Sequence, residues 1–133
     1  MSARIEQGKP RTRFEGIEPI LNVADIAKSL KYYVNVLGFT KAAWGEAFTA
    51  VARDGHGIYL CQAGQGHPGT WVWVGVEDVE ALYEEYTRSG ATIRHPPRNY
   101  PWALEMHVED PDGHVLRFGS EPRAGSSFDS FIE

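Results

Sequence analysis

The order of apolar and polar positions along the chain predicts several short β-strands. Valine occupies every second position of the segment 72–76, and Trp71, Trp73 and Gly75 occupy the positions between. The segment 103–108 alternates in the same way, with Glu105 and His107 among aliphatic residues. Successive side chains of a strand point to opposite faces of its sheet. We therefore expect one aliphatic face that packs against helices and an opposite face rich in aromatic and polar side chains.

Two further segments have helical periodicity, from about Ile26 to Leu37 and from about Val79 to Ser89. An aspartate precedes each segment and can cap its first turn, and Gly38 and Gly90 suit a left-handed residue after the last turn. Apolar residues three or four positions apart give each helix one hydrophobic stripe. The stripes comprise Ile26, Leu30, Tyr33, Val34 and Leu37 in the first helix and Val79, Leu82, Tyr83 and Tyr86 in the second.

The two halves of the chain repeat each other. Val23-Ala24-Asp25-Ile26 recurs as Val76-Glu77-Asp78-Val79, and Asp54-Gly55-His56 recurs as Asp112-Gly113-His114. Asp-Gly before an alternating run indicates a β-hairpin, so a strand, a helix and three strands are expected in each half. The sequence predicts an α+β fold of two βαβββ modules that form a curved mixed sheet, with helices on one face and an open cleft on the other.

The modules are predicted at residues 16–63 and 70–121, within one compact domain. A linker that contains glycine and proline joins them, and residues 1–15 and 122–133 are expected to be an arm and a loose tail. The net charge of −5, with scattered basic residues, argues against nucleic acid as a partner. No segment is apolar enough to span a membrane or act as a secretory signal, and the single Cys61 suits a reducing cytoplasm.

The aromatic and polar face has two interpretations, a ligand cleft or a subunit interface, and the two coincide if the cleft lies between subunits. Cys61 is expected to be a packing residue. Glu105 and His107 share one strand face, where they either bind a metal or ligand or are ordinary polar residues. The other histidines fall in turns and loops and are expected to be solvated: His56, His67, His95 and His114. Motifs of serine hydrolases, phosphate-binding loops and zinc proteases are absent.

Several segments resemble the vicinal oxygen chelate (glyoxalase/bleomycin resistance/dioxygenase) superfamily, over about residues 17–121. They are the first strand and helix, Pro19 to Phe39, and the run Glu109 to His114 before the last strand. Within the superfamily, Trp71 to Asp78 with Leu82 to Tyr86, and Pro101 to Met106, are similar to bleomycin-resistance proteins. Ala103 stands where those proteins often have glycine.

The resemblance also identifies where a metal would be held. Metal-using members place one His, Glu or Gln ligand on each of four cleft strands, and the corresponding positions here are Glu18, Tyr59, Trp71 and Arg117. Only Glu18 is a candidate metal ligand, because Arg117 brings a fixed positive charge that repels a cation. We therefore expect no metal and no other cofactor.

The resemblance implies a non-catalytic role, the sequestration of a bleomycin-type or other planar aromatic molecule in a groove of a cytoplasmic homodimer. Glu105 is expected to favour a cationic end of the ligand, which Arg117 opposes unless it pairs with Glu18 or Glu105. The segment from Arg94 to Trp102, stiffened by its prolines, is expected to form a loop over the ligand. The alternatives are a glyoxalase- or dioxygenase-like metal enzyme, or a binding domain for another metabolite. The expected ligand-binding residues are Phe48, Tyr59, Trp71, Trp73, Tyr100, Trp102, Glu105 and Arg117.

Overall fold

The computed structural model describes residues 11–13, 15–42 and 46–130, and it confirms the two βαβββ modules. The first module contains β1 (Ile20–Asn22), α1 (Ile26–Lys31), the π-helix η1 (Tyr32–Val36), β2 (Thr40–Lys41), β3 (Phe48–Arg53) and β4 (His56–Cys61). The second contains β5 (Trp71–Gly75), α2 (Val79–Ser89), β6 (Thr92–Asn99), β7 (Leu104–Glu109) and β8 (Val115–Ser120).

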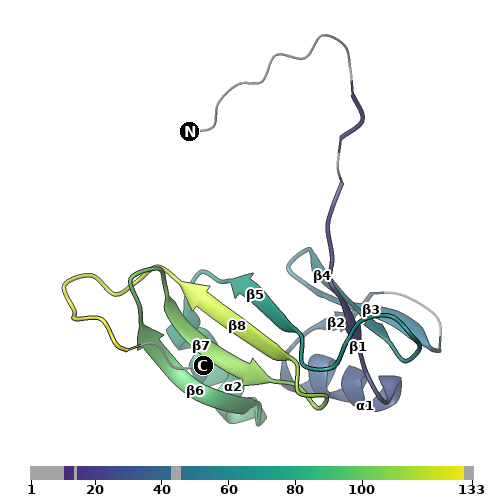
Figure 1. Cartoon of the computed structure of the whole chain (residues 1–133). Helices are drawn as coiled ribbons and strands as arrows, with labels where there is room; N and C mark the ends of the chain where they lie inside the picture. The colour runs from purple at the N-terminus through teal and green to yellow at the C-terminus, as the bar shows by residue number, and fades with distance from the viewer. Residues whose placement is uncertain (1–10, 14, 43–45, 131–133) are drawn as a thin grey trace.

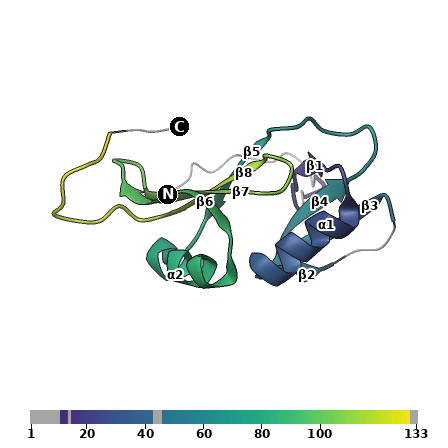
Figure 2. The same ribbon diagram turned by 90° about the horizontal axis from the view of Figure 1, so that it is seen from below.

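The predicted mixed sheet comprises two four-stranded sheets, one from each module. Their strand orders are β1-β4-β3-β2 and β5-β8-β7-β6. The first strand of each module pairs in parallel with the last one, and the remaining pairs are antiparallel. The two sheets lie side by side (Figure 1), and both helices lie on the same side of them (Figure 2). The α+β fold with helices on one face is therefore confirmed.

The second predicted helix is observed with the expected bounds, whereas the first changes its geometry partway. Asp78 accepts a hydrogen bond from Ala81 N at 3.1 Å, and Gly90 ends α2 with a φ of 88°. The first α-helix ends at Lys31, and a π-helical turn follows in which Leu37 N donates to Tyr32 O. The Tyr32 hydroxyl on this turn binds Glu109 O at 2.6 Å. A contact with the other module thus accompanies the departure from α-helical geometry.

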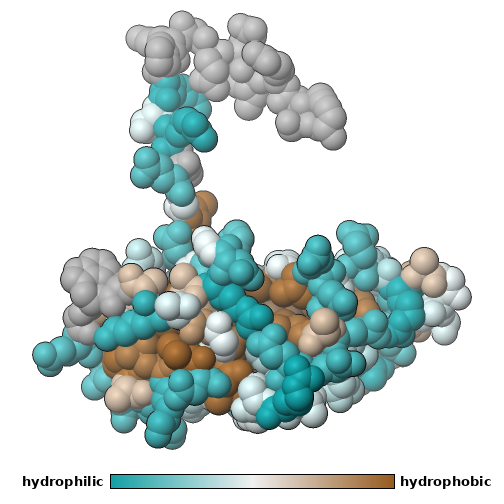
Figure 3. Space-filling view, turned by 180° about the vertical axis from the view of Figure 1, so that it is seen from behind, coloured by the Kyte–Doolittle hydropathy of each residue, from teal (hydrophilic) through white to brown (hydrophobic). Residues whose placement is uncertain are grey.

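A continuous hydrophobic core lies between the helices and the two sheets. It includes Leu21 and Leu60 of the first module and Tyr86, Met106 and Phe118 of the second. The valines of β5 pack against it, as their alternation predicted. Seen from the side opposite to Figure 1, hydrophobic residues also reach the surface among hydrophilic ones (Figure 3).

His114 joins the two modules, which corrects the expectation of a solvated histidine. Its side chain is fully buried, Nδ1 accepts from Thr70 N at 2.9 Å, and Nε2 donates to Asn22 O. Asp110 accepts hydrogen bonds from His114 N and the Tyr33 hydroxyl. The loop between β7 and β8 is therefore anchored on the end of β1 and on the turn that follows α1.

The two Asp-Gly turns differ in length, although the sequence repeat predicted equivalent hairpins. Asp54 and Gly55 form a two-residue turn with φ values of 51° and 82°, as in a type I′ hairpin. In the second module Glu109 pairs with Val115, so that residues 110–114 form a longer loop around Gly113. This longer loop reaches across to the other module, where Asp112 accepts from Ala24 N at 2.9 Å.

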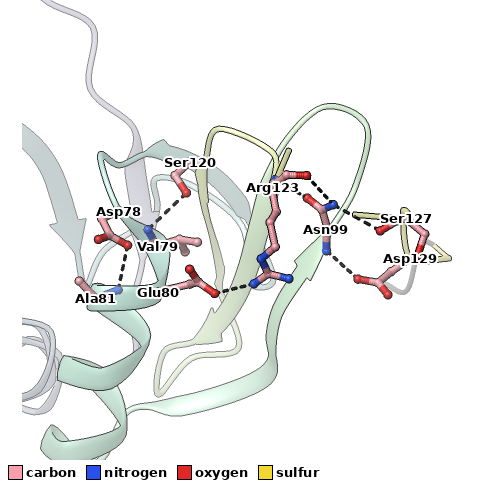
Figure 4. Close-up of polar contacts among 9 residues, drawn as sticks. All are labelled: Asp78, Val79, Glu80, Ala81, Asn99, Ser120, Arg123, Ser127 and Asp129. Atoms are coloured by element: carbon pink, nitrogen blue, oxygen red, sulfur yellow. Dashed lines mark hydrogen bonds and ion pairs between the residues drawn. The ribbon is translucent and has the colours of Figure 1, made fainter. Parts of the chain in front are cut away.

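The C-terminal segment is held by hydrogen bonds, which differs from the loose tail expected. The buried Asn99 is the centre of this contact (Figure 4). Its side chain accepts from Arg123 N and donates to Arg123 O and Ser127 O, and its backbone exchanges hydrogen bonds with Asp129. Arg123 also forms an ion pair with Glu80 of α2. The segment therefore fixes the end of β6, from which the turn that carries Trp102 departs.

Residues 94–99 belong to strand β6 and not to the loop predicted from their prolines. Pro96 and Pro97 fall where the pairing of β6 with β7 shifts register, between His95 and Arg98. Proline is tolerated there because β6 is an edge strand and the irregular register does not require an N–H from each residue. The segment that remains a turn is short and contains Pro101 and Trp102.

Candidate functional site

The face of the second sheet that points away from the helices carries the candidate site. Trp71 and Trp73 lie on β5, Glu105 and His107 on β7, and Arg117 on β8. The strand register places Trp73 opposite Arg117, and Arg117 opposite His107. The intervening residues of these strands pack into the core. The alternation of apolar and polar positions thus brings five of the predicted polar and aromatic side chains onto one surface.

Glu105 is the polar centre of this surface and is fully buried. Its Oε1 accepts a hydrogen bond from Trp102 Nε1 at 2.7 Å. Its Oε2 accepts from His107 Nε2 at 2.7 Å and from Arg117 Nε at 2.5 Å. Burial alone would raise the pKa of the carboxyl, but hydrogen bonds from Arg117, His107 and Trp102 outweigh it and lower the pKa below its usual value. Glu105 is therefore an ionised anchor for three surrounding side chains.

His107 and His95 stand next to each other behind this anchor, with ring centroids 4.2 Å apart. A carboxylate only accepts, so His107 donates its Nε2 proton to Glu105 and its Nδ1 is left as an acceptor. His95 donates from Nδ1 to Pro96 O, which leaves Nε2 as an acceptor. Neither remaining nitrogen has a hydrogen-bond partner among the described residues, and both are buried. Because His95 is buried, the expectation that it is solvated is corrected.

We expect His107 to make folding stability fall as the pH is lowered. Burial lowers the pKa of His107, whereas the unfolded side chain takes up a proton near its usual value of 6.5. Below that value the unfolded chain binds more protons than the folded one, so this contribution to stability is present above pH 6.5 and declines with acidification. Urea denaturation from about pH 7.5 to about pH 5.5 measures it.

His107→Gln is the matched variant for this measurement, because glutamine can still donate a hydrogen bond to Glu105 and does not titrate. The other histidines contribute equally to the pH dependence of stability in the natural protein and in the variant. We expect the free energy of unfolding of the variant to change less over this pH range than that of the natural protein. If the free energy of unfolding changes with pH in the same way in both proteins, His107 takes up its proton equally in the folded and unfolded chains, and the prediction is wrong.

Three tryptophans are exposed around the buried anchor. The exposed fractions are 42% for Trp71, 50% for Trp73 and 52% for Trp102. The guanidinium of Arg94 lies 5.4 Å from the ring of Trp71, and that of Arg117 lies 5.6 Å from the ring of Trp73. These cation–π contacts hold two indole rings in place while leaving them accessible. The arrangement offers flat aromatic surfaces to a ligand.

The structure places Tyr100 behind this surface and not on it. Tyr100 is fully buried and stacks on Trp102, with ring centroids 4.9 Å apart and planes 15° apart. Its role is therefore to support Trp102, and it does not present a surface of its own. Trp102 is also held by its hydrogen bond to Glu105.

Phe48 and Tyr59 lie on the other sheet, apart from the tryptophans. They are neighbours on β3 and β4, with ring centroids 5.3 Å apart, and both are half-buried. The eight predicted ligand-binding residues thus form two groups within one chain. A pair of aromatic rings belongs to the first module, and the remaining six residues, Glu105 and five around it, belong to the second.

Gly119 was not singled out in the sequence, yet it is required for the position of Trp73. A Cβ atom at Gly119 would lie 2.3 Å from Trp73 Cη2 and 2.9 Å from Cζ2. The indole ring therefore lies directly over the glycine backbone. The alternation along β8 places Gly119 on the same face as Arg117, which is a signal that sequence reasoning could have used.

The residues at the four superfamily metal positions do not fit a divalent cation. Glu18 and Tyr59 belong to the first module, whereas Trp71 and Arg117 belong to the second. Indole and guanidinium groups supply N–H donors and no ligand atom. Across residues 11–13, 15–42 and 46–130, no group of three or more His, Cys, Asp or Glu side chains is placed to hold a metal. Cys61 is buried, and its Sγ accepts from Ala63 N.

A separate cavity of about 590 Å³ lies between the modules. Its walls include the short turn at Asp54, the edge of β5, and Tyr86 and Phe118 from the core. The two-residue turn at Asp54 lines this cavity, whereas in the other half the longer loop contacts the segment before α1 through Asp112 and Ala24. The cavity borders the aromatic face at Trp73 and Gly75.

Comparison with known proteins identifies the family. A sequence model of the glyoxalase/bleomycin resistance protein/dioxygenase superfamily matches residues 15–118, so the chain belongs to this superfamily, as its motifs predicted. The search of curated protein sequences found no match. In the part of the chain that the structure describes, no helix has the length and apolar character needed to cross a membrane.

Solved structures with the same fold include proteins that bind antibiotics. The bleomycin-binding protein of the bleomycin producer Streptomyces verticillus, complexed with copper(II)-bleomycin, is 26% identical with a TM-score of 0.72, and the match covers 83% of this chain and 98% of that one. TnmS3, an antibiotic binding protein from Streptomyces sp. CB03234, is 22% identical with a TM-score of 0.72, over 85% of this chain and 100% of that one. TioX from Micromonospora sp. ML1 is 23% identical with a TM-score of 0.69, over 81% and 99%.

Proposed function

We propose that this protein binds a planar aromatic small molecule, of the kind that bleomycin represents, without transforming it. The observation that carries the proposal is the group of three exposed tryptophans, Trp71, Trp73 and Trp102, around the buried Glu105. Indole rings stack on heteroaromatic rings and bury large apolar areas at little cost in conformational entropy. The antibiotics bound by the structural relatives from Streptomyces support the same class of ligand.

The chemistry of the surface favours binding over catalysis. The buried carboxylate of this surface, Glu105, is occupied by three hydrogen-bond donors and is not free to act as a base. The superfamily positions that would hold a metal carry Trp71 and Arg117, which are unsuited to it. Sequestration needs only a surface that matches the ligand, and the exposed indole rings provide one.

We further propose that two copies of the chain form the complete site. Within one chain the aromatic pair Phe48 and Tyr59 lies on a different sheet from the tryptophans. A homodimer that brings the first module of one copy to the second module of the other would enclose a ligand between both groups. Such a groove would bury more of a ring system than an open face can.

Titration with bleomycin tests the binding proposal. We expect saturable quenching of tryptophan fluorescence and measurable heat, with a Kd near or below ~1 μM. Trp73→Leu is expected to weaken binding by about tenfold or more, because it removes a stacking surface. Leu has a comparable apolar character at a half-exposed position, so the fold is expected to persist. Absence of heat and of quenching at ~10 μM bleomycin would exclude a bleomycin-type ligand.

A further inference from the structure

We propose that Arg117 recognises an oxygen-acceptor group on the ligand, so that the preferred ligand is a planar aromatic carboxylate or a ring with an equivalent pair of oxygen acceptors. This inference rests on the proposed function, because it concerns the same aromatic surface. The ligand charge that it favours is opposite to the one expected from the sequence, where Glu105 was expected to attract a cationic group.

The free hydrogen-bond donors of Arg117 are the first observation. Its Nε–H is used by Glu105, and the side chain remains 28% exposed. Among the described residues, no group accepts a hydrogen bond from either of its Nη atoms. Each Nη carries two protons, so the outward edge of the guanidinium offers donors and no acceptor. Two parallel N–H donors in one plane match the two oxygens of a carboxylate.

The second observation is that this guanidinium is held in one orientation. Glu105 binds it at Nε and is itself fixed by hydrogen bonds from Trp102 and His107. The ring of Trp73 lies 5.6 Å from the guanidinium on another side. A donor group that is oriented before the ligand arrives loses little freedom on binding, which favours selective recognition.

The third observation concerns the charges that a ligand would meet. Glu105 is fully buried, so its negative charge is directed to Arg117 and His107 and not to the surface. Arg94 adds a second positive charge beside Trp71, and its ion partner Glu109 is 4.0 Å away. A guanidinium group therefore lies beside each of the two indole rings, and the one beside Trp73 is balanced only by the buried Glu105, whereas the one beside Trp71 is balanced by the partly exposed Glu109. An anionic or acceptor-bearing ring is favoured there over a cationic one.

A matched pair of small probes tests this inference on the whole protein. The probes are 2-naphthoate and 2-naphthamide, which share one planar ring system and differ in charge at the substituent. Calorimetry and tryptophan quenching up to ~1 mM probe would measure both affinities. We expect 2-naphthoate to bind about tenfold more tightly, because two anionic oxygens accept a bidentate pair of hydrogen bonds where 2-naphthamide offers one neutral carbonyl oxygen. Equal affinities would overturn the inference.

Variants of Arg117 separate its donor geometry from its charge. Arg117→Gln is expected to abolish the preference for 2-naphthoate, leaving both probes with similar affinity. Arg117→Lys keeps the charge and the ion pair with Glu105 but lacks the planar pair of donors, so it is expected to retain only part of the preference. Arg88→Gln removes the same charge from the exposed surface of α2 and should keep the full preference. A full preference in Arg117→Lys and Arg117→Gln would overturn the assignment.

The outcomes distinguish this inference from the proposed function. If bleomycin and both naphthalene probes fail to bind, the aromatic binding function is wrong and the inference falls with it. If the two naphthalene probes bind equally to the natural protein, aromatic binding stands and only the role of Arg117 is overturned. If Arg117→Gln does not fold, the comparison of the two probes on the natural protein and on Arg117→Lys decides the question.

Discussion

Replacing Glu105 with glutamine is expected to lower the free energy of unfolding by about 2 kcal/mol, although the side chain keeps its size. The carboxylate accepts three hydrogen bonds, from Trp102 at one oxygen and from His107 and Arg117 at the other. Whichever way the amide is turned, its NH₂ group meets at least one N–H donor. The change also removes the charge that neutralises Arg117, which is only partly exposed to water.

Glu109→Gln is the matched control for this prediction. Glu109 lies on the same strand and also faces an arginine, but its side chain is 40% exposed and its distance to Arg94 is 4.0 Å. A solvated ion pair of this kind contributes less than about 0.5 kcal/mol. Urea denaturation of both variants at pH 7 measures the difference. Similar losses in the two variants would show that Glu105 is not the anchor that its hydrogen bonds indicate.

Local sequence patterns were sufficient to predict most of the fold. The alternation in residues 71–76 separated the valines from the tryptophans correctly, because a strand has a fixed period of two residues. The second helix was predicted with its observed bounds, since Asp78 and Gly90 mark its two ends. The π-helical turn after Lys31 was not predicted, because contacts of Tyr32 and Tyr33 with the other module are specified by distant residues.

The sequence predicted which residues form the candidate site, but it did not predict all the hydrogen bonds between them. The same alternation placed Glu105, His107 and Arg117 on one face, and sequence reasoning allowed that Arg117 pairs with Glu105. It did not predict that Glu105 is sealed from water, because its cover comes from Trp102 in a separate turn. The hydrogen bonds of Asn99 to the C-terminal segment are likewise absent from any local pattern, since about thirty residues separate the partners.

The second large effect is expected from Gly119→Ala, which should weaken ligand binding by about tenfold while changing the free energy of unfolding by less than about 1 kcal/mol. The added Cβ would overlap the ring of Trp73, whose Cη2 atom lies 2.3 Å from that position. Because Trp73 is half-exposed, its ring can move into the solvent without breaking the core. The protein therefore keeps its fold and loses the stacking surface beside Arg117.

Gly75→Ala provides a matched control from the same row of the sheet. Gly75 pairs with Gly119 across β5 and β8, yet a Cβ there would meet only Trp73 Nε1, at an ordinary contact distance of 3.7 Å. Tryptophan emission is expected to shift to longer wavelength in Gly119→Ala and to stay unchanged in Gly75→Ala. Bleomycin titration of the two variants then relates the position of the ring to affinity.

The comparison of these two glycine variants shows whether Trp73 contacts the ligand or is only exposed to solvent. If Gly119→Ala shifts the emission but binds bleomycin as the natural protein does, Trp73 does not contact the ligand. If the emission shifts and affinity falls together, while Gly75→Ala changes neither, the ring must lie over Gly119 for binding. The glycine then acts through the indole that it allows to lie flat on the sheet, where Arg117 holds the ring from one side.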